Sequence, residues 1–215
     1  MRIRNRWLMI LTACAFAAVC LLSGCEKQEF DAGSYVQAMM DATYHNESGK
    51  FTEMDLGKKS EAETMHKETV DALAEALSDV LGEIADDAAK DRIREAVEGL
   101  CLKTDYKIGE VLEDNGVYLV DVKIKPIEFT ALFEGETFDQ DADAAVKAAM
   151  EQKEDITPEE LNAVLVDLMM TRLEAAEKQP TFGEEEKVQI KVRKKDDLYE
   201  IPPSGWEMLD EHLIR

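Results

Sequence analysis

Two runs of alternating apolar and polar residues flank the dipeptide Asn115-Gly116, and this arrangement constrains the fold more than any other feature of the sequence. Asn and Gly both adopt a positive φ angle readily, so Asn-Gly between alternating runs is a strong signal for a tight β-hairpin. We therefore predict an antiparallel pair of strands, from about Tyr106 to Leu112 and from about Val117 to Lys125.

The second predicted strand indicates a sheet with one packed face and one wet face, because successive side chains point to opposite sides of a strand. The packed face would hold Tyr118, Val120, Val122 and Ile124, and the wet face Asp121, Lys123 and Lys125. A second hairpin is predicted near the C-terminus. It comprises a strand with Val188, Ile190 and Val192 inward, a turn at 195–197, a short strand at 198–201 and a helical turn after Pro203.

Apolar residues recur with the helical period before the first hairpin and again between the two hairpins. Three helices are predicted in the first region: from Asp31 as N-cap to about His45, from the capping box Ser60-x-x-Glu63 to Leu81, and from Asp86 or Asp87 past Leu100. Two more are predicted at 138–153 and 156–178, the second with Thr157 as its N-cap. Because helices and antiparallel strands are segregated along the chain, the predicted fold class is α+β.

The N-terminus has the composition of an export signal. Three arginines in "MRIRNR" precede sixteen residues of which Thr12 is the only polar one. A membrane-spanning helix needs about 20 apolar residues, and the charged residues Glu26 and Lys27 come too early for one. We therefore predict that residues 1–24 are a signal peptide, with an uncleaved membrane anchor as the alternative.

The four residues Leu22-Ser23-Gly24-Cys25 end this segment and resemble the lipobox of bacterial lipoproteins. The resemblance implies that the Cys25 thiol receives a diacylglycerol and that the lipoprotein signal peptidase then cuts before Cys25. Residues 25–30 would form a lipidated tether, and the membrane would be a partner through the diacylglyceryl-cysteine. The implied location is the outer, extracytoplasmic face of the membrane of a Gram-positive cell.

Cleavage at this point would remove two of the four cysteines and three arginines. With Cys25 lipidated, Cys101 alone would remain, so no intramolecular disulfide is expected and Cys101 is predicted to be a small buried hydrophobe. The formal charge would change from −22 to −25. Such a surface repels nucleic acid and anionic lipid headgroups, so nucleic acid is excluded as a partner and attachment is expected from the acyl chains.

The segments "SYVQAMMDATYHNESGKF" and "VRKKDDLYEIPPSGWEMLDEHL", at 34–51 and 192–213, resemble small lipoproteins of Gram-positive bacteria with a cystatin-like domain, related in shape to nuclear-transport-factor-like folds. The resemblance implies a single domain over 31–215, in which N-terminal helices pack on a curved antiparallel sheet of about four strands. The helical pair 139–178 would be an insertion. The concave side of the sheet is the predicted pocket, lined by Tyr106, Tyr118, Tyr199 and Trp206.

No motif in the sequence specifies a reaction. Asp139, Asp141 and Asp143 occupy the first, third and fifth places of a calcium-binding EF-hand loop, but Ala144 replaces the turn glycine and Met150 replaces the bidentate glutamate. We therefore expect no catalytic residue, no metal and no cofactor. The three histidines belong to no zinc motif, and surface positions are expected for His45, His66 and His212.

These patterns favour a non-enzymatic, lipid-anchored envelope protein that acts as a binding or interaction module for an unknown protein or small-molecule partner. The alternative is a carrier of a small ligand or peptide that uses the concave face of the sheet, and a hydrolase is a third hypothesis. An interaction module predicts an exposed apolar patch. A carrier predicts an apolar pocket with a few convergent polar groups.

Overall fold

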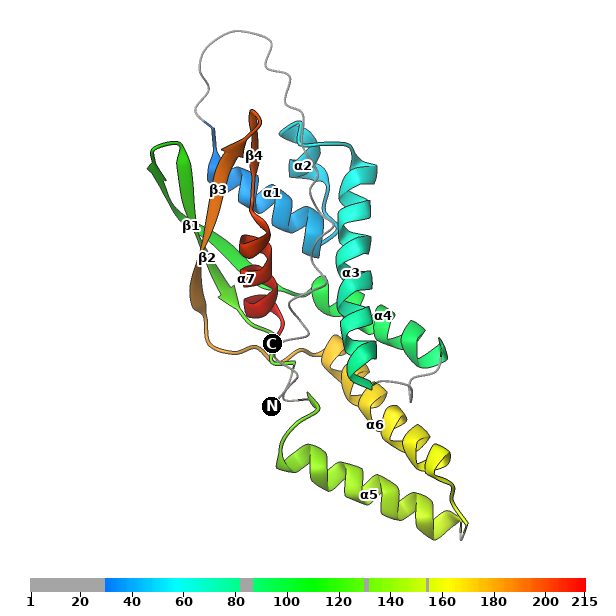
Figure 1. Ribbon diagram of the computed structural model, residues 1–215. Helices are drawn as coiled ribbons and strands as arrows, with labels where there is room; N and C mark the ends of the chain where they lie inside the picture. The colour runs from blue at the N-terminus through cyan, green and yellow to red at the C-terminus, as the bar shows by residue number, and fades with distance from the viewer. Residues whose placement is uncertain (1–29, 82–86, 130–131, 154) are drawn as a thin grey trace. The chain divides into compact units, whose positions relative to one another are not determined.

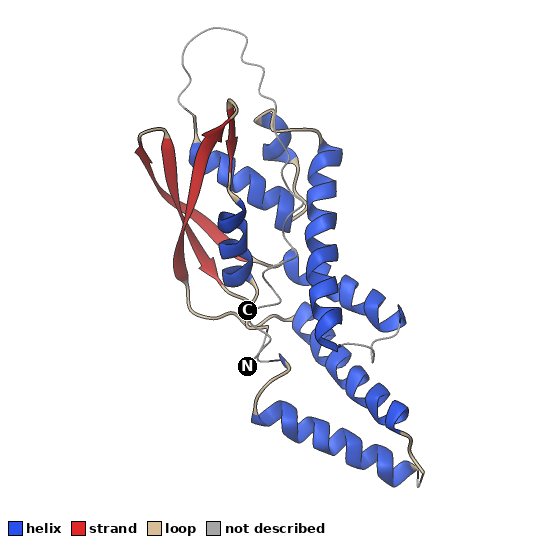
Figure 2. Cartoon of the chain, viewed as in Figure 1, coloured by secondary structure: helices blue, strands red, loops and turns tan. Residues whose placement is uncertain are grey.

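The computed structural model describes residues 30–81, 87–129, 132–153 and 155–215. Over these residues the chain forms seven helices and four strands (Figures 1 and 2), which confirms the predicted α+β class. The predicted leader (1–24) and Cys25 lie outside the described residues. The elements are α1 (Ala32–Tyr44), α2 (Gly49–Glu53), α3 (Lys59–Leu81), α4 (Asp87–Cys101), β1 (Asp105–Asp114), β2 (Val117–Lys125), α5 (Glu136–Gln152), α6 (Pro158–Lys178), β3 (Glu186–Lys195), β4 (Leu198–Glu200) and α7 (Pro203–Leu213).

The chain divides into two compact units, each assembled from separate stretches of sequence. The first unit runs up to Thr69 and adds Thr104–Pro126 and Gly183–Ile214, so it holds α1, α2, all four strands and α7. The second unit takes Val70–Lys103, Ile127–Phe182 and Arg215, and holds α4, α5 and α6. One domain over 31–215 with an insertion at 139–178 stays a prediction.

The four strands of the first unit form one antiparallel sheet in the order β1-β2-β3-β4. In the turn between β1 and β2, Asn115 and Gly116 have φ angles of 52° and 78°. Positive φ at both central residues matches a tight hairpin turn, which confirms the first predicted hairpin. The turn between β3 and β4 uses Asp196 and Asp197, with φ angles of 49° and 68°. Aspartate is one of the few residues that accept this region readily.

Helix α1 covers one face of the sheet (Figure 1). It begins where predicted, because the Asp31 carboxylate accepts a hydrogen bond of 2.9 Å from the backbone N–H of Ser34. This hydrogen bond is also the main cause that lowers the pKa of the Asp31 carboxyl group. Ten of the 13 residues of α1 are buried, so the helix is a central element of the first unit and not a surface layer.

The hydrophobic core of the first unit fills the space between the sheet and its helices. The sheet contributes the alternate residues Val120, Val122, Ile124, Val188, Ile190 and Val192, all buried. Helices α1 and α7 contribute Val36, Met40, Leu209 and Leu213, which are fully buried. The inward faces of β2 and β3 are therefore those that the alternating sequence predicted.

Helix α7 is longer than expected. The sequence predicted a single helical turn after Pro203, whereas the helix runs for 11 residues. Leu209 and Leu213 are four positions apart, so they lie on one side of the helix, and both are fully buried. Burial of this apolar side against the sheet stabilises a helix whose sequence carries no strong start signal beyond the proline in its first turn.

The chain between α1 and α3 also differs from the prediction. The short helix α2, which was not predicted, begins at Gly49 and buries Phe51. Helix α3 begins at Lys59, so Ser60 lies inside it and the capping box predicted on Ser60 is wrong. The Glu61 carboxylate instead accepts a 2.6 Å hydrogen bond from the backbone N–H of Lys58, which satisfies a donor at the helix start.

The outer face of the sheet is polar and includes one buried carboxylate. Asp121, predicted to be wet, is only 7% exposed. It accepts hydrogen bonds of 2.9 Å from Lys187 Nζ and 3.1 Å from Gln189 Nε2, and these bonds, that of Lys187 first, lower the pKa of the Asp121 carboxyl group. Gly109 on β1 makes this close packing possible, because a Cβ atom there would lie 3.2 Å from Asp121 Cβ.

In the second unit, α4 packs on α6. Ile93 of α4 and Met170 and Leu173 of α6 are fully buried. Arg92 Nε donates a 2.7 Å hydrogen bond to Glu174 Oε1 beside this apolar contact. The start of α6 confirms the prediction, since Thr157 and Glu160 form a reciprocal capping box.

Replacing Ile190 with alanine should destabilise the first unit by about 2–5 kcal/mol, because it leaves a cavity in a close-packed core. Urea unfolding followed by the fluorescence of Trp206, which lies on α7 of the same unit, measures the loss. Lys191→Ala, at the neighbouring exposed position, is the control and should change stability by less than about 0.5 kcal/mol. Equal losses in the two variants would contradict the assignment of the inward face.

Candidate functional site

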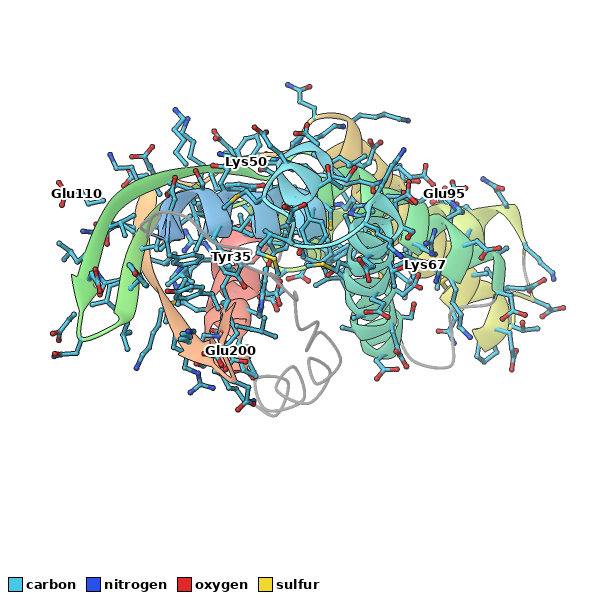
Figure 3. All side chains as sticks on the ribbon, turned by 90° about the horizontal axis from the view of Figure 1, so that it is seen from above. Tyr35, Lys50, Lys67, Glu95, Glu110 and Glu200 are labelled. Atoms are coloured by element: carbon cyan, nitrogen blue, oxygen red, sulfur yellow. The ribbon has the colours of Figure 1, made fainter. Side chains whose placement is uncertain are left out.

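Of the four aromatic residues predicted to line a pocket, Tyr118 and Tyr199 come together in the structure. Their ring centroids are 5.9 Å apart, and the Phe30 ring stacks on Tyr199 with a centroid distance of 3.4 Å. Tyr35, labelled in Figure 3, extends from α1 toward β4, where its hydroxyl donates a 3.0 Å hydrogen bond to the Tyr199 carbonyl. These four rings pack against the core of the first unit.

The other two predicted residues lie in a different group. The Tyr106 ring stacks on the His45 ring, 4.8 Å between centroids, and its edge approaches Tyr44 at 6.5 Å. Trp206 also lies 6.5 Å from Tyr44. Around both groups, the inward residues of the sheet and residues of α1 and α7 form one buried hydrophobic core. A pocket lined by these four aromatic residues stays a prediction.

A polar cluster surrounds Tyr106. The Tyr106 hydroxyl donates a 2.8 Å hydrogen bond to Asp41 Oδ1 and lies 3.3 Å from His45 Nδ1. On the other side of the ring, His45 Nε2 lies 2.9 Å from the Thr104 carbonyl oxygen and 3.1 Å from Thr104 Oγ1. Burial first, and then the hydrogen bond to Asp41, raise the pKa of the Tyr106 phenol.

This cluster brings a carboxylate, an imidazole and a hydroxyl together, as a hydrolase would, but its hydrogen bonds assign the protons differently. A carbonyl oxygen can only accept, so neutral His45 carries its proton on Nε2, the nitrogen that faces Thr104. In that tautomer Nε2 cannot remove a proton from the Thr104 hydroxyl. Thr104 is also buried. The arrangement therefore favours a structural role over nucleophilic catalysis.

A second acid and phenol pair ties α1 to α7. The Tyr44 hydroxyl donates a 2.6 Å hydrogen bond to Asp210 Oδ1. Removal from water raises the pKa of the Asp210 carboxyl group to about 6, and the neighbouring carboxylates Glu207 and Glu211 add to this rise, while the bond from Tyr44 opposes it. Asp210 is thus a group whose charge changes close to neutral pH.

The remaining candidate residues of the sequence take mostly structural positions. His66 is buried, with Nδ1 3.0 Å from the Thr43 carbonyl, so the predicted surface position is wrong for this histidine. Cys101 is buried, as predicted. Asp139, Asp141 and Asp143 lie within α5 and form no loop. Within the described ranges, no three His, Cys, Asp or Glu side chains are placed to hold a metal ion.

An open apolar groove lies on the helical pair α5 and α6, which run in opposite directions in Figure 1. We call these two helices the acidic hairpin and this depression the hairpin groove. The groove has a volume of about 440 Å³ and is lined by Ala145 of α5 and by Ala163, Val164, Asp167, Leu168 and Thr171 of α6. It is wide open to solvent, so it is a surface depression and does not enclose a ligand.

Helix α5 is unusual because none of its 17 residues is buried. An amphipathic helix normally draws its stability from burying its apolar side. The apolar residues of α5 are mainly alanines, which offer little area to bury, and Met150 is 55% exposed. The hairpin groove is therefore apolar surface that the rest of the described chain does not cover.

The hairpin groove was not among the features predicted from the sequence. The sequence does contain a pattern that indicates this uncovered surface. Leu161, Val164, Leu165, Leu168 and Met169 of α6 make an apolar stripe wider than one neighbouring helix of small residues can bury, and all five remain partly exposed. None of the described helices has the length and apolar character needed to cross a membrane.

The fold is that of an α+β protein with helices packed on a four-stranded antiparallel sheet. No family model and no curated protein matches the chain. Among solved structures, the chain is similar to a "putative lipoprotein (ycdA)" from Bacillus subtilis, with a TM-score of 0.60 and 18% sequence identity. The match covers 86% of this chain and 56% of that one, so this chain spans little more than half the length of its structural neighbour. At this identity the likeness shows a shared fold.

The raised pKa of the partly buried Asp210 predicts how stability depends on pH. Because the folded-state pKa of Asp210 is raised from 3.8 to about 6, its contribution to stability is fully present below pH 3.8 and is lost as the pH rises through 6. Asp210→Asn keeps an acceptor for Tyr44 without the charge. The variant should therefore gain up to about 3 kcal/mol relative to the wild type between pH 3.5 and pH 7.5.

Urea unfolding at both pH values, followed by Trp206 fluorescence, measures this difference. Asp197→Asn is a suitable control, because Asp197 is exposed and its pKa is lowered by Lys194. That variant should show no gain as the pH rises. An Asp210→Asn curve parallel to the wild-type curve would contradict the raised pKa.

Proposed function

We propose that this chain is a lipid-anchored lipoprotein of the cell envelope, held on the outer face of the membrane, where it acts as a non-enzymatic interaction module. The pattern Leu22-Ser23-Gly24-Cys25 after an apolar run supports the anchor. The fold shared with a protein described as a lipoprotein supports the same location. The open hairpin groove carries the proposal that the module binds a partner.

The anchor follows from the chemistry of acyl chains. Each buried CH₂ group contributes roughly 0.8 kcal/mol, and stable attachment needs two chains, a condition that a diacylglyceryl group on Cys25 meets. The residues after Cys25 are few before the described structure begins at Phe30, and five extended residues span at most about 17 Å. The anchor would therefore keep the folded chain near the membrane surface, while its strong negative charge would keep it off anionic headgroups.

The interaction module is better supported than the carrier or the hydrolase. A carrier needs a cavity on the inward side of the sheet, and there Val120, Ile190 and Met40 pack together without exposure. A hydrolase needs a base that can remove a proton from a nucleophile, and His45 directs its protonated nitrogen to a carbonyl oxygen. An interaction module needs an accessible apolar surface, which the hairpin groove provides.

Replacing Cys25 with alanine tests the anchor. The variant should lose the acyl chains, and the protein should move from the membrane fraction to the soluble fraction or remain as unprocessed precursor. Cys101→Ala is the matched control, because Cys101 is buried in the second unit and should leave the membrane attachment unchanged. Fractionation with immunoblotting and mass spectrometry of the N-terminus measure both outcomes. A Cys25→Ala protein that is still processed and membrane-bound would overturn the lipoprotein proposal.

A photo-crosslinking residue in place of Ala163 tests the interaction module in intact cells. Ala163 lines the hairpin groove and is exposed, so irradiation should give one discrete adduct of higher mass. The same residue placed at Lys191, on the outer face of the sheet, should not give that adduct. Adding Leu168→Gln to the Ala163 variant should reduce the adduct severalfold. Equal adducts from both positions would argue against a binding role for the groove.

A further inference from the structure

We infer that the hairpin groove binds a cationic amphipathic helix of a partner protein, with the apolar side of that helix against Val164 and Leu168 and its lysines or arginines against the surrounding carboxylates. This inference rests on the proposed interaction module and specifies the chemistry of its partner. It follows from three properties of the acidic hairpin: its uncovered apolar surface, the shape of that surface and its charge.

The uncovered surface is the first property. Helix α6 buries Val166, Met170 and Leu173, while Leu168 remains partly exposed and Ala163 is exposed. On the other side of the groove, α5 contributes Ala145 and has no buried residue along its length. Covering these apolar side chains removes them from water, which is the main driving force for association. A ligand for this site must therefore present apolar groups of its own.

The shape of the groove favours a helix. Its lining on α6 consists of positions 163, 164, 167, 168 and 171, spaced by three and four residues along one side of the helix. A groove between two helices accepts the side-chain ridge of a third helix, whose anchors recur at the same spacing. The lining extends over nine residues of α6, about 12 Å at 1.5 Å per residue. A partner helix of little more than two turns would span it.

The negative charge of the acidic hairpin favours a partner with positive charge. Its two helices carry ten acidic and three basic side chains, a formal charge of −7. Of the three cations, Arg172 is already engaged, since it contacts Asp141 and stacks over Phe138. Three cations from neighbouring segments also pair with carboxylates of the hairpin: Arg92 with Glu174, Lys103 with Glu177 and Lys153 with Glu160. Ten acidic side chains against these six basic ones leave a formal charge of −4. Asp167 lines the groove itself with its side chain 74% exposed, and its ion pair with Arg92 is long, at 3.4 Å. A lysine or arginine beside the partner's apolar side would meet the exposed Asp167 carboxylate.

The same negative charge disfavours two other possible occupants of the groove, a second copy of this chain and an anionic bilayer. Two copies of this chain would bring two negatively charged hairpins together, and like charges in contact oppose association. An anionic bilayer would repel the hairpin for the same reason. A basic amphipathic helix is complementary in both respects, because its apolar side matches the groove and its cations match the Asp167 carboxylate.

Three synthetic helical peptides of about 15 residues test the inference against full-length protein held in nanodiscs of neutral lipid, with empty nanodiscs as the baseline. The first has a leucine stripe flanked by lysines. The second has the same stripe flanked by glutamates, and the third has serines in the stripe and keeps the lysines. Fluorescence anisotropy of the labelled peptides measures binding. Only the first should bind well, at least about tenfold more tightly than the others, and raised salt should weaken it.

Two protein variants locate the binding. Leu168→Gln should weaken the first peptide about tenfold, because a polar amide would then face its apolar side. Met208→Gln is the matched control, since Met208 is another partly exposed apolar residue, on α7 of the first unit. That change should alter binding less than about twofold. Urea unfolding of both variants verifies that they remain folded.

Each other outcome overturns the inference in a different way. Equal binding of the lysine and glutamate peptides, weakened alike by Leu168→Gln, would leave the interaction module standing and remove the cationic partner. Binding unaffected by Leu168→Gln would place the peptide elsewhere. Self-association in sedimentation experiments, lost in Leu168→Gln, would make a second copy the occupant, and binding to anionic nanodiscs through the groove would make it the membrane. No peptide binding, together with no adduct at Ala163, would remove the proposed module as well.

Discussion

The inward aliphatic face of β2 and β3 is the constraint on which the first unit depends. Because side chains alternate along a strand, a slip of one residue would bring Lys123 and Lys187 into the core and expose Ile124 and Val188. The strands therefore have one workable register, and their aliphatic face must be covered. Helix α1 and the C-terminal helix α7 supply that cover, from opposite ends of the described chain, and each fully buried Val, Ile or Leu contributes roughly 1.5–3 kcal/mol.

In the acidic hairpin, the apolar surface is only partly covered. Its two helices pack on each other, and α6 packs on α4, but no described element covers the remaining apolar side of α6. The first unit thus covers its apolar surface, whereas the hairpin leaves part of its own exposed beside the Asp167 carboxylate. Net negative charge keeps such a surface from associating with copies of itself. The proposed binding of a partner rests on this uncovered apolar surface.

Local chemistry explains which elements were predictable. Asn115-Gly116 adopts positive φ in almost any context, and Thr157 with Glu160 satisfies the start of its own helix, so both signals were confirmed. The capping box predicted on Ser60 is wrong because α3 already begins at Lys59. There the Glu61 carboxylate accepts a hydrogen bond from the backbone N–H of Lys58. His66 was expected at the surface because a histidine alone does not show whether a backbone carbonyl will be nearby when it is buried.

The sequence by itself determined the two hairpins and the inward residues of β2 and β3, because each is encoded over a few consecutive residues, and the order of these elements along the chain determined the α+β class. Only the tertiary structure decided how the aromatic residues divide. Tyr118 and Tyr199 join Phe30, whereas Tyr106 stacks on His45, because partners distant in sequence are chosen by packing. It also decided that the hairpin groove is open. Whether an apolar stripe is covered depends on what folds against it, and no stretch of sequence carries that information alone.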